Sequence, residues 1–257
     1  MISFQNITVD FGGLRAVDQA SFEIDRGRIT GLIGPNGAGK TTAFNVIAGH
    51  VRPNKGTVTL DGQNITSLKP HQRAALGLAR TFQIAHEFSR LTVVENLMAA
   101  AASPIGENLF NVVFRRNIFE TEEREHYTFA RETIKLLELD HVRDEKAGNL
   151  SGGQKKLVEL GRALMRKPKI VLLDEIGAGI NRTLLAKLAD KIKLLNQERG
   201  LTFCLIEHDL DYVSKLCDYV LVMAQGKVLT QGTVDQVRCD ERVIEAYFGG
   251  GKYEAQR

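Results

Sequence analysis

The sequence predicts an α/β fold: a mostly parallel sheet forms the core, joined to an N-terminal antiparallel β-subdomain and an α-helical insert. Apolar and polar residues alternate over 2–9 and 20–24, which is typical of half-buried antiparallel strands. Short, continuously apolar runs at 170–173 and 202–206 are separated by a helical pattern, as expected for a parallel sheet. Residues 84–149 are predicted to be almost entirely helical, so we expect one domain over 1–257 with a helical subdomain inserted at 84–149.

The elements of the first half follow in order. A short apolar strand at 28–33 leads into a glycine-rich loop, and residues 42–49 have helical spacing with a glycine at the end. A strand at 56–60 ends in the turn Asp61-Gly62, and a short helix is predicted to begin near Pro70, since proline is favoured in the first helical turn.

In the second half, residues 120–139 form the clearest amphipathic helix, and another helix is predicted to end near Met165. A helix at 184–199 separates the two buried strands. Strands at 219–223 and 227–230 flank a turn and predict a hairpin, and a last helix ends at residue 248.

The bulk composition is that of a globular protein without a nucleic-acid surface. The 257 residues carry 34 basic and 31 acidic side chains, a net charge of +3 that is too balanced for such a surface. The three cysteines, Cys204, Cys217 and Cys239, form no CxxC pair, so we expect buried free thiols in a reducing compartment. The N-terminus does not resemble a signal peptide. The apolar segment 91–105 is shorter than the roughly 20 residues that a bilayer requires, so we expect membrane association through partners.

The glycine-rich loop after the strand at 28–33 matches the phosphate-loop pattern G-x-x-x-x-G-K-[ST]. The loop reads Gly34-Pro35-Asn36-Gly37-Ala38-Gly39-Lys40-Thr41-Thr42. Glycines allow backbone N–H groups to surround phosphate oxygens, the following helix points its positive end at them, and Lys40 adds a charge near the outer phosphates. Thr41 is predicted to bind Mg²⁺. The alternative is an ordinary glycine-rich turn, which the flanking strand and helix disfavour.

Two acidic residues end the strand at 170–173. Asp174 is predicted to hold Mg²⁺ while Glu175 faces a water molecule as a general base. Seen alone, such a pair is often a solvated strand end, but the phosphate loop favours function. His208 follows the strand at 202–206, at the carboxyl edge where ligands of open α/β sheets bind, and could reach the terminal phosphate. We assign no role to the other five histidines.

The segment Leu150-Ser151-Gly152-Gly153-Gln154 precedes the helix that ends near Met165. A serine and a bare glycine backbone at a helix N-terminus predict a second anion site, separate from the one at Lys40. A capped helix with a flexible start is the structural alternative, and it accounts for the serine and one glycine but not for the whole pentapeptide.

Six features resemble those of the ATP-binding cassette (ABC) ATPases in their order and spacing, over nearly the whole chain. They are Phe11, the phosphate loop, Gln83, LSGGQ, LLDE and His208. The resemblance implies the ABC ATPase fold, a P-loop NTPase core, with ATP and Mg²⁺ as cofactors. It implies that Phe11 stacks on adenine, although a core phenylalanine is the alternative, and that Gln83 contacts Mg²⁺ or the attacking water. It also implies that Ser151, Gly152, Gly153 and Gln154 grip the γ-phosphate of ATP bound to an opposite subunit in a head-to-tail dimer.

Three residues depart from the family pattern. Ile176 stands where the family usually has proline after the catalytic glutamate, Asn181 stands where many relatives have aspartate, and Arg182 adds a charge at the expected subunit interface. Because Lys40 and Glu175 are both present with the rest of the catalytic set, we expect active hydrolysis.

Residues 77–83, 109–116 and 243–249 resemble the ATPases of branched-chain amino acid importers, whose close relatives serve urea or short amides. This resemblance implies a dimer with a second ATPase chain, which is either an identical copy or a sibling. It also implies two membrane permeases and an extracytoplasmic (periplasmic or extracellular) binding protein that acts indirectly. The expected location is peripheral, on the cytoplasmic face of the inner membrane. Two alternatives remain open at this point: a soluble ABC protein acting on ribosomes or DNA, and a nucleotide-binding regulatory subunit with little hydrolysis.

Overall fold

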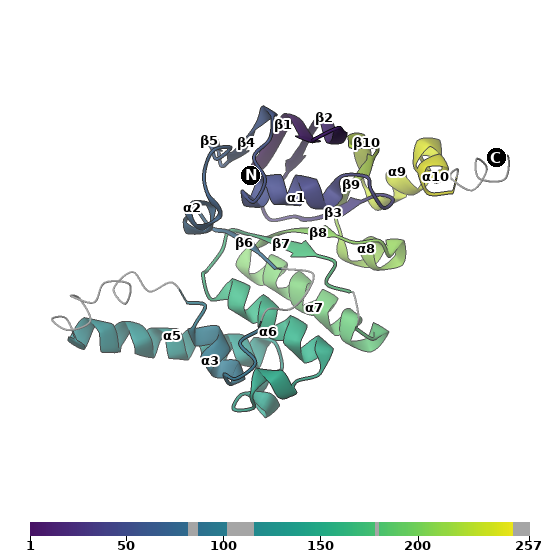
Figure 1. The fold of residues 1–257 in the computed structure, drawn as a ribbon. Coiled ribbons are helices and arrows are strands. Elements are labelled where there is room, and N and C mark those ends of the chain that lie inside the picture. Colours follow the sequence, from purple (N-terminus) through teal and green to yellow (C-terminus); the bar gives the residue numbers. More distant parts are fainter. Residues whose placement is uncertain (82–86, 102–115, 178–179, 249–257) are drawn as a thin grey trace. The chain divides into compact units, whose positions relative to one another are not determined.

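The computed structural model describes residues 1–81, 87–101, 116–177 and 180–248. The chain divides into two compact units, each of which is described by itself. Unit 1 contains Met1–Arg80, Lys169–Ile176 and the chain from Ile192 onward, and unit 2 contains Thr81–Pro168 and Gly177–Lys191. Figure 1 shows the elements of both units along the chain.

Unit 1 begins with an antiparallel sheet in the order β2-β1-β4-β5. Its strands are β1 (Ile2–Phe11), β2 (Leu14–Ile24), β4 (Lys55–Leu60) and β5 (Gln63–Asn64). The predicted N-terminal β-subdomain is therefore confirmed. The first two strands are longer than predicted because they form a continuous hairpin, with Phe11 paired to Leu14 across a two-glycine turn.

The second sheet of unit 1 has the strand order β10-β9-β3-β8-β7-β6. Its strands are β3 (Ile29–Ile33), β6 (Leu78–Arg80), β7 (Ile170–Asp174), β8 (Thr202–Ile206), β9 (Tyr219–Ala224) and β10 (Lys227–Gly232). All neighbouring pairs are parallel except the β9–β10 hairpin, which confirms the mostly parallel sheet. Strand β6 was not predicted, because three residues are too few for a recognisable pattern.

The helices of unit 1 are α1 (Lys40–Ala48), α2 (Pro70–Ala75), α8 (Leu210–Leu216), α9 (Val234–Arg238) and α10 (Glu241–Phe248). Helix α1 starts two residues before the predicted start, so Lys40 and Thr41 lie in its first turn. Helices α8 and α9 were not predicted. Each has fewer than eight residues, too few to show a clear helical period.

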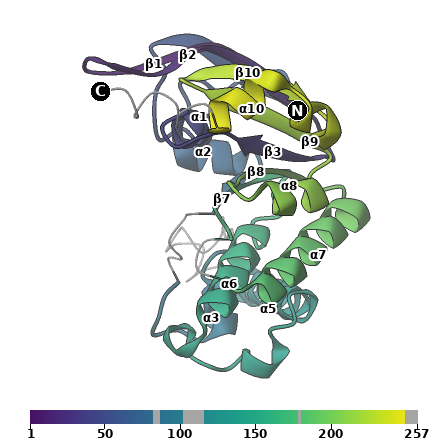
Figure 2. The same cartoon turned by 90° about the vertical axis from the view of Figure 1, so that its right-hand side faces the viewer.

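Helix α1 lies between the two sheets of unit 1 (Figures 1 and 2). Phe44 and Ile47 on this helix are fully buried in one hydrophobic core, together with Phe4 of β1 and Ile206 of β8. Because apolar side chains of both sheets pack on α1, the helix that follows the phosphate loop has a fixed place in unit 1.

The C-terminal end of α1 is capped by an arginine from α2. Arg73 is 1% exposed, and its guanidinium donates hydrogen bonds to four backbone carbonyl groups, those of Val46, Ile47, Leu68 and Thr66. Burial lowers the pKa of Arg73 to about 10. The last carbonyl groups of a helix need partners outside the helix, and this side chain supplies them.

Unit 2 is helical. It contains α3 (Val93–Met98), α5 (Arg116–Leu136), α6 (Gly152–Leu164), the first part of α7 (Arg182–Arg199), and two 3₁₀ helices, η1 (Asp140–Val142) and η2 (Ala147–Asn149). The expected insert, 84–149, lies inside this unit, but the unit also includes α6. The reason is close packing: a Cβ added to Gly161 of α6 would lie 3.1 Å from the Leu137 side chain and 3.3 Å from that of Leu97.

Cys204 and Cys217 are buried, as predicted, and burial raises the pKa of both thiols. The prediction is wrong for Cys239, which is exposed. This residue directly follows the short α9 and serves as its C-terminal cap residue, so it lies at the surface and not in the core. Among the helices that the structure describes, none has the length and apolar character needed to cross a membrane.

Candidate functional site

Three strand ends meet at one edge of the parallel sheet in unit 1. The register pairs Ile206 of β8 with Asp174 of β7 on one side and with Leu32 of β3 on the other. Each of these strands then continues into a segment with candidate functional residues. The phosphate loop, Glu175 and His208 therefore leave the sheet at the same edge, where ligands of open α/β sheets bind.

The phosphate loop requires glycine at two positions. Gly34 has φ 147°, and a Cβ there would overlap the carbonyl oxygen of Met223. Gly39 has φ 95°, and a Cβ there would lie 2.5 Å from the carbonyl oxygen of Ala16. Gly39 is also the N-cap of α1 and provides no side-chain hydrogen bond, so the first amides of this helix are available to an anion.

The Lys40 side chain folds back over the loop. The residue is 8% exposed, and its Nζ donates to the carbonyl oxygens of Gly34 at 2.7 Å and Pro35 at 2.9 Å. Burial lowers the pKa of Lys40, and the charges of Glu175 and Asp174 oppose this shift. The ammonium group is thus bonded to neutral carbonyl groups that a phosphate oxygen could replace with a stronger, charge-assisted bond.

The remaining loop residues differ in exposure. Asn36, Gly37 and Thr41 are exposed, Ala38 is buried, and Thr42 is half-buried in the first turn of α1.

Asp174 is buried, with 5% of its surface exposed, and forms an ion pair of 2.7 Å with Arg80. Glu175 is half-buried and has φ 46°, in the left-handed region that non-glycine residues seldom adopt. Its backbone N–H donates to the carbonyl of Ile206 at 3.0 Å, which holds the turn against β8. Such backbone conformations are concentrated at functional sites. Ile176, at the position of the expected proline, is 4% exposed and belongs to the core.

Thr41 and Asp174 provide a hydroxyl and a carboxylate oxygen, the hard ligands that Mg²⁺ prefers. Within the described ranges, no group of three or more His, Cys, Asp or Glu side chains could hold a metal ion. A Mg²⁺ that takes one or two protein ligands and completes its shell with phosphate oxygens and water needs no such group, so the donor set fits.

His208 has a 69% exposed side chain, and its Nδ1 lies 3.9 Å from Oε2 of the buried Glu207. Phe11 is 50% exposed, so the alternative of a core phenylalanine is wrong and its ring is available for stacking. Gln83 lies outside the described residues.

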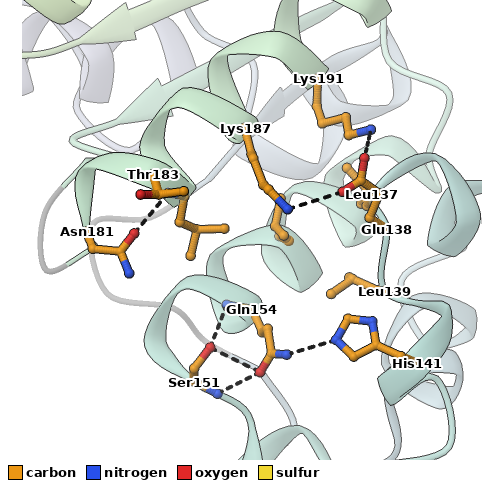
Figure 3. Close-up of a pocket in the computed structure, with 12 residues that line it drawn as sticks. Leu137, Glu138, Leu139, His141, Ser151, Gln154, Asn181, Thr183, Lys187 and Lys191 are labelled. Atoms are coloured by element: carbon orange, nitrogen blue, oxygen red, sulfur yellow. Dashed lines mark hydrogen bonds and ion pairs between the residues drawn. The ribbon is translucent and has the colours of Figure 1, made fainter.

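The second predicted anion site, residues 150–154, lies in unit 2. Ser151 is the N-cap of α6 and forms a capping box with Gln154 (Figure 3). The Ser151 N–H and Oγ both donate to the Gln154 side-chain oxygen at 3.0 Å, and the Gln154 N–H donates to Ser151 Oγ at 3.4 Å. The box satisfies two backbone N–H donors, those of Ser151 and Gln154, and the exposed Gly152 begins the helix beside it.

Gly153 has a packing reason for its missing side chain. A Cβ at this position would overlap Cδ2 of Leu184 and lie 2.9 Å from its Cγ. We expected both glycines of this segment to leave the backbone bare for an anion. The structure shows that the missing side chain at Gly153 also makes room for the Leu184 side chain of α7.

A cavity of about 330 Å³ adjoins this segment within unit 2 (Figure 3). Leucine side chains and polar groups from η1, α6 and α7 line it, and ion pairs join Glu138 to Lys187 and Lys191. His141 Nε2 lies 3.3 Å from Gln154 Nε2, so this histidine, to which we assigned no role, contacts the capping residue. The sequence contained no signal for this contact.

Asn181, a departure from the family pattern, caps α7: its side-chain oxygen accepts a hydrogen bond from the Leu184 N–H at 2.9 Å. Asparagine and aspartate are equivalent N-caps, so this departure preserves the local structure. Arg182, the departure that adds a charge, is exposed in the first turn of α7.

Two family models match the sequence. One, described as ABC transporter, matches residues 17–178, and the other, described as branched-chain amino acid ATP-binding cassette transporter, matches residues 227–253. The chain is 38% identical over 256 residues to the probable branched-chain amino acid transport ATP-binding protein LivG of Archaeoglobus fulgidus, covering 100% of this chain and 98% of the relative. It is 36% identical over 249 residues to the high-affinity branched-chain amino acid transport ATP-binding protein BraF of Pseudomonas aeruginosa, covering 97% and 98%.

Solved structures agree with these matches. A nucleotide-free ATP-binding cassette from an ABC transporter superimposes with a TM-score of 0.84 at 36% identity, covering 96% of this chain and 98% of the other. The ADP conformation of a cassette from an ABC transporter gives 0.83 at 35% identity, covering 97% and 98%.

Proposed function

Because the chain belongs to the ABC transporter family, whose ATP-binding subunits hydrolyse ATP to power transport, we propose that it powers an importer of branched-chain or other hydrophobic amino acids. The match of residues 227–253 to a branched-chain transporter model and the names of the relatives support this substrate class. One observation carries the catalytic part of the proposal: β3 and β7 both pair with β8, so the phosphate loop with Lys40 and the pair Asp174 and Glu175 lie at the same edge of the sheet.

The phosphate loop binds the triphosphate of ATP. Its backbone N–H groups and the uncapped start of α1 surround the phosphates, and Lys40 exchanges its carbonyl partners for phosphate oxygens. Thr41 and Asp174 hold Mg²⁺, which when bound neutralises part of the phosphate charge. Phe11, exposed at the end of β1, stacks on the adenine.

Glu175 acts as the general base on the attacking water. The left-handed backbone at Glu175 turns the chain away from the regular path of β7, and the bond from its N–H to the Ile206 carbonyl keeps that turn in place. His208 contacts the terminal phosphate from the end of β8, and Gln83 contacts Mg²⁺ or the water.

A second cassette, a copy of this chain or a sibling, completes the site in a head-to-tail dimer. Ser151 and the start of α6, with Gly152, Gly153 and Gln154, bind the γ-phosphate of ATP held by the opposite subunit. The supporting observation is the capped helix start, whose serine is an exposed residue and whose first helical residue, Gly152, has no side chain.

The dimer couples to two membrane permeases at the cytoplasmic face of the inner membrane, as a peripheral subunit, and an extracytoplasmic binding protein delivers the amino acid to the permeases.

Phosphate release by the purified chain tests hydrolysis. Glu175→Gln is expected to lower the rate about 10²–10⁴-fold while ATP binding persists, because a positioned general base contributes about that much. Equal rates in the two proteins would contradict the role of Glu175 as general base. If the wild type releases no phosphate even when it is assembled with its permeases, the chain is instead a nucleotide-binding regulatory subunit.

Uptake by the chain and its co-purified permeases, reconstituted in vesicles with the binding protein, tests the substrate class. We expect leucine, isoleucine or valine to stimulate hydrolysis and to accumulate. Stimulation by urea or a short amide without any response to these amino acids would contradict the substrate class and leave the ATPase assignment intact.

A further inference from the structure

Arg80, the last residue of β6, joins the proposed Mg²⁺ ligand to the helix of the phosphate loop. Its NH2 donates to Asp174 Oδ2 at 2.7 Å, and its NH1 donates to Asn45 Oδ1 at 2.6 Å. Asn45 lies on α1, and all three residues belong to unit 1. One guanidinium therefore connects β6, β7 and α1 through directed bonds.

The ion pair is buried. The side chains of Arg80 and Asp174 are 9% and 8% exposed. Two nitrogens of a planar guanidinium are fixed by different elements, so its plane cannot rotate without breaking one of the bonds. In turn, Asp174 is held at a single carboxylate oxygen: within the part of the chain that the structure describes, Arg80 bonds Oδ2 and leaves Oδ1 for another partner.

We propose that Arg80 is a positioning residue for Mg²⁺ binding: it holds the Asp174 carboxylate in one orientation, by Oδ2, so that Oδ1 is presented to the metal. This inference rests on the proposed role of Asp174. Asn45 anchors the guanidinium, and the same helix carries Lys40 and Thr41, so the metal ligands and the phosphate-binding groups keep a common frame. Partners that orient a metal ligand typically change metal affinity about 10–100-fold when removed.

A purely stabilising ion pair is the competing explanation. Buried ion pairs contribute little net stability compared with apolar replacements, so stability alone does not require this pair. Charge alone makes the opposite prediction for metal binding: a positive group next to the ligand repels Mg²⁺, and its removal would tighten binding. The direction of the change in Mg²⁺ affinity therefore distinguishes positioning from charge.

The experiment titrates Mg²⁺ into the full chain with a fluorescent, non-hydrolysable ATP analogue and compares wild type with Arg80→Gln and Arg80→Lys. We expect both variants to raise the Mg²⁺ midpoint about tenfold or more, while affinity for the analogue in EDTA stays at the wild-type value. Arg80→Lys keeps the charge but cannot bond Asn45 and Asp174 in the same fixed plane. An unchanged or lower midpoint in Arg80→Gln, or a wild-type midpoint in Arg80→Lys, would overturn the inference.

Two further variants make the test robust. Asn45→Ala removes only the anchor and leaves the ion pair, so we expect a smaller increase of the midpoint in the same direction and a folded chain.

Asp174→Asn separates the two proposals. If this variant retains the wild-type Mg²⁺ dependence, the assigned role of Asp174 fails. If it loses that dependence while the Arg80 variants behave as wild type, only the role of Arg80 fails.

Discussion

Gly153→Ala tests whether residue 153 must be glycine to make room for the Leu184 side chain, in addition to any need for an open backbone at a ligand site. An added Cβ would overlap Leu184 Cδ2 and lie 2.9 Å from Cγ, where ordinary carbon contacts are about 3.5–4.0 Å. Overpacking of this kind typically costs about 1–3 kcal/mol. Alanine also favours a helix over glycine by about 1 kcal/mol. The two effects oppose each other, and we expect a net loss of up to about 2 kcal/mol in the free energy of unfolding.

Denaturant unfolding followed by far-UV circular dichroism measures this loss, with the exposed Gly152→Ala as the matched control on the same helix. A double-mutant cycle isolates the contact: in a Leu184→Ala background, Gly153→Ala is expected to become neutral or stabilising, a coupling of about 1 kcal/mol or more. The packing argument is refuted if Gly153→Ala alone stabilises the chain, or if its cost is the same with and without the leucine side chain.

Three further outcomes are expected. Arg73→Met removes the guanidinium donor from four carbonyl groups, of which those of Val46 and Ile47 are bonded in the buried interior, and Val46 keeps a bond from the Gly49 N–H. At about 1–3 kcal/mol for a buried unsatisfied group we expect a loss of about 2 kcal/mol or more in thermal or denaturant unfolding, and a loss below about 1 kcal/mol would contradict the cap. Asn181→Asp retains the cap of α7, so we expect its stability to equal that of the wild type or to exceed it by about 0.3–1 kcal/mol. Asn181→Ala removes the cap and is expected to lose about 1 kcal/mol. Equal stability of the two variants would argue against capping. Titration with a thiol reagent is expected to modify Cys239 in the native chain and to reach Cys204 and Cys217 only after unfolding, because burial raises the pKa of both thiols; rapid native modification of all three would contradict the packing.

The phosphate loop and the strand ends could be predicted because their signals are local. A strand, a glycine-rich turn and a helix follow one another directly over residues 29–48, and the backbone at Gly34 and Gly39 requires glycine. The buried runs at β7 and β8 placed Asp174 and His208 at the ends of strands, and parallel strands end at a common edge.

What could not be predicted depends on contacts between residues distant in the sequence. Arg80 and Asp174 are 94 residues apart, and no periodicity indicates that they form a pair. The contact of His141 with Gln154 and the packing of Leu184 on Gly153 are equally invisible in a linear pattern, because each depends on how separate helices of unit 2 pack. The exposed Cys239 was mispredicted because a five-residue helix does not show which face is buried.

The central claim is that ATP is held by the phosphate loop of one chain and by the start of α6 of another. Light scattering on the Glu175→Gln chain, alone or mixed with the cassette that shares its permeases, measures this most directly. We expect MgATP to produce a dimer, Ser151→Asn to preserve it, and Ser151→Asp to abolish it while ATP still binds. Asparagine and aspartate both cap the helix, so only the added negative charge differs. An equally tight ATP-dependent dimer with Ser151→Asp would contradict the claim.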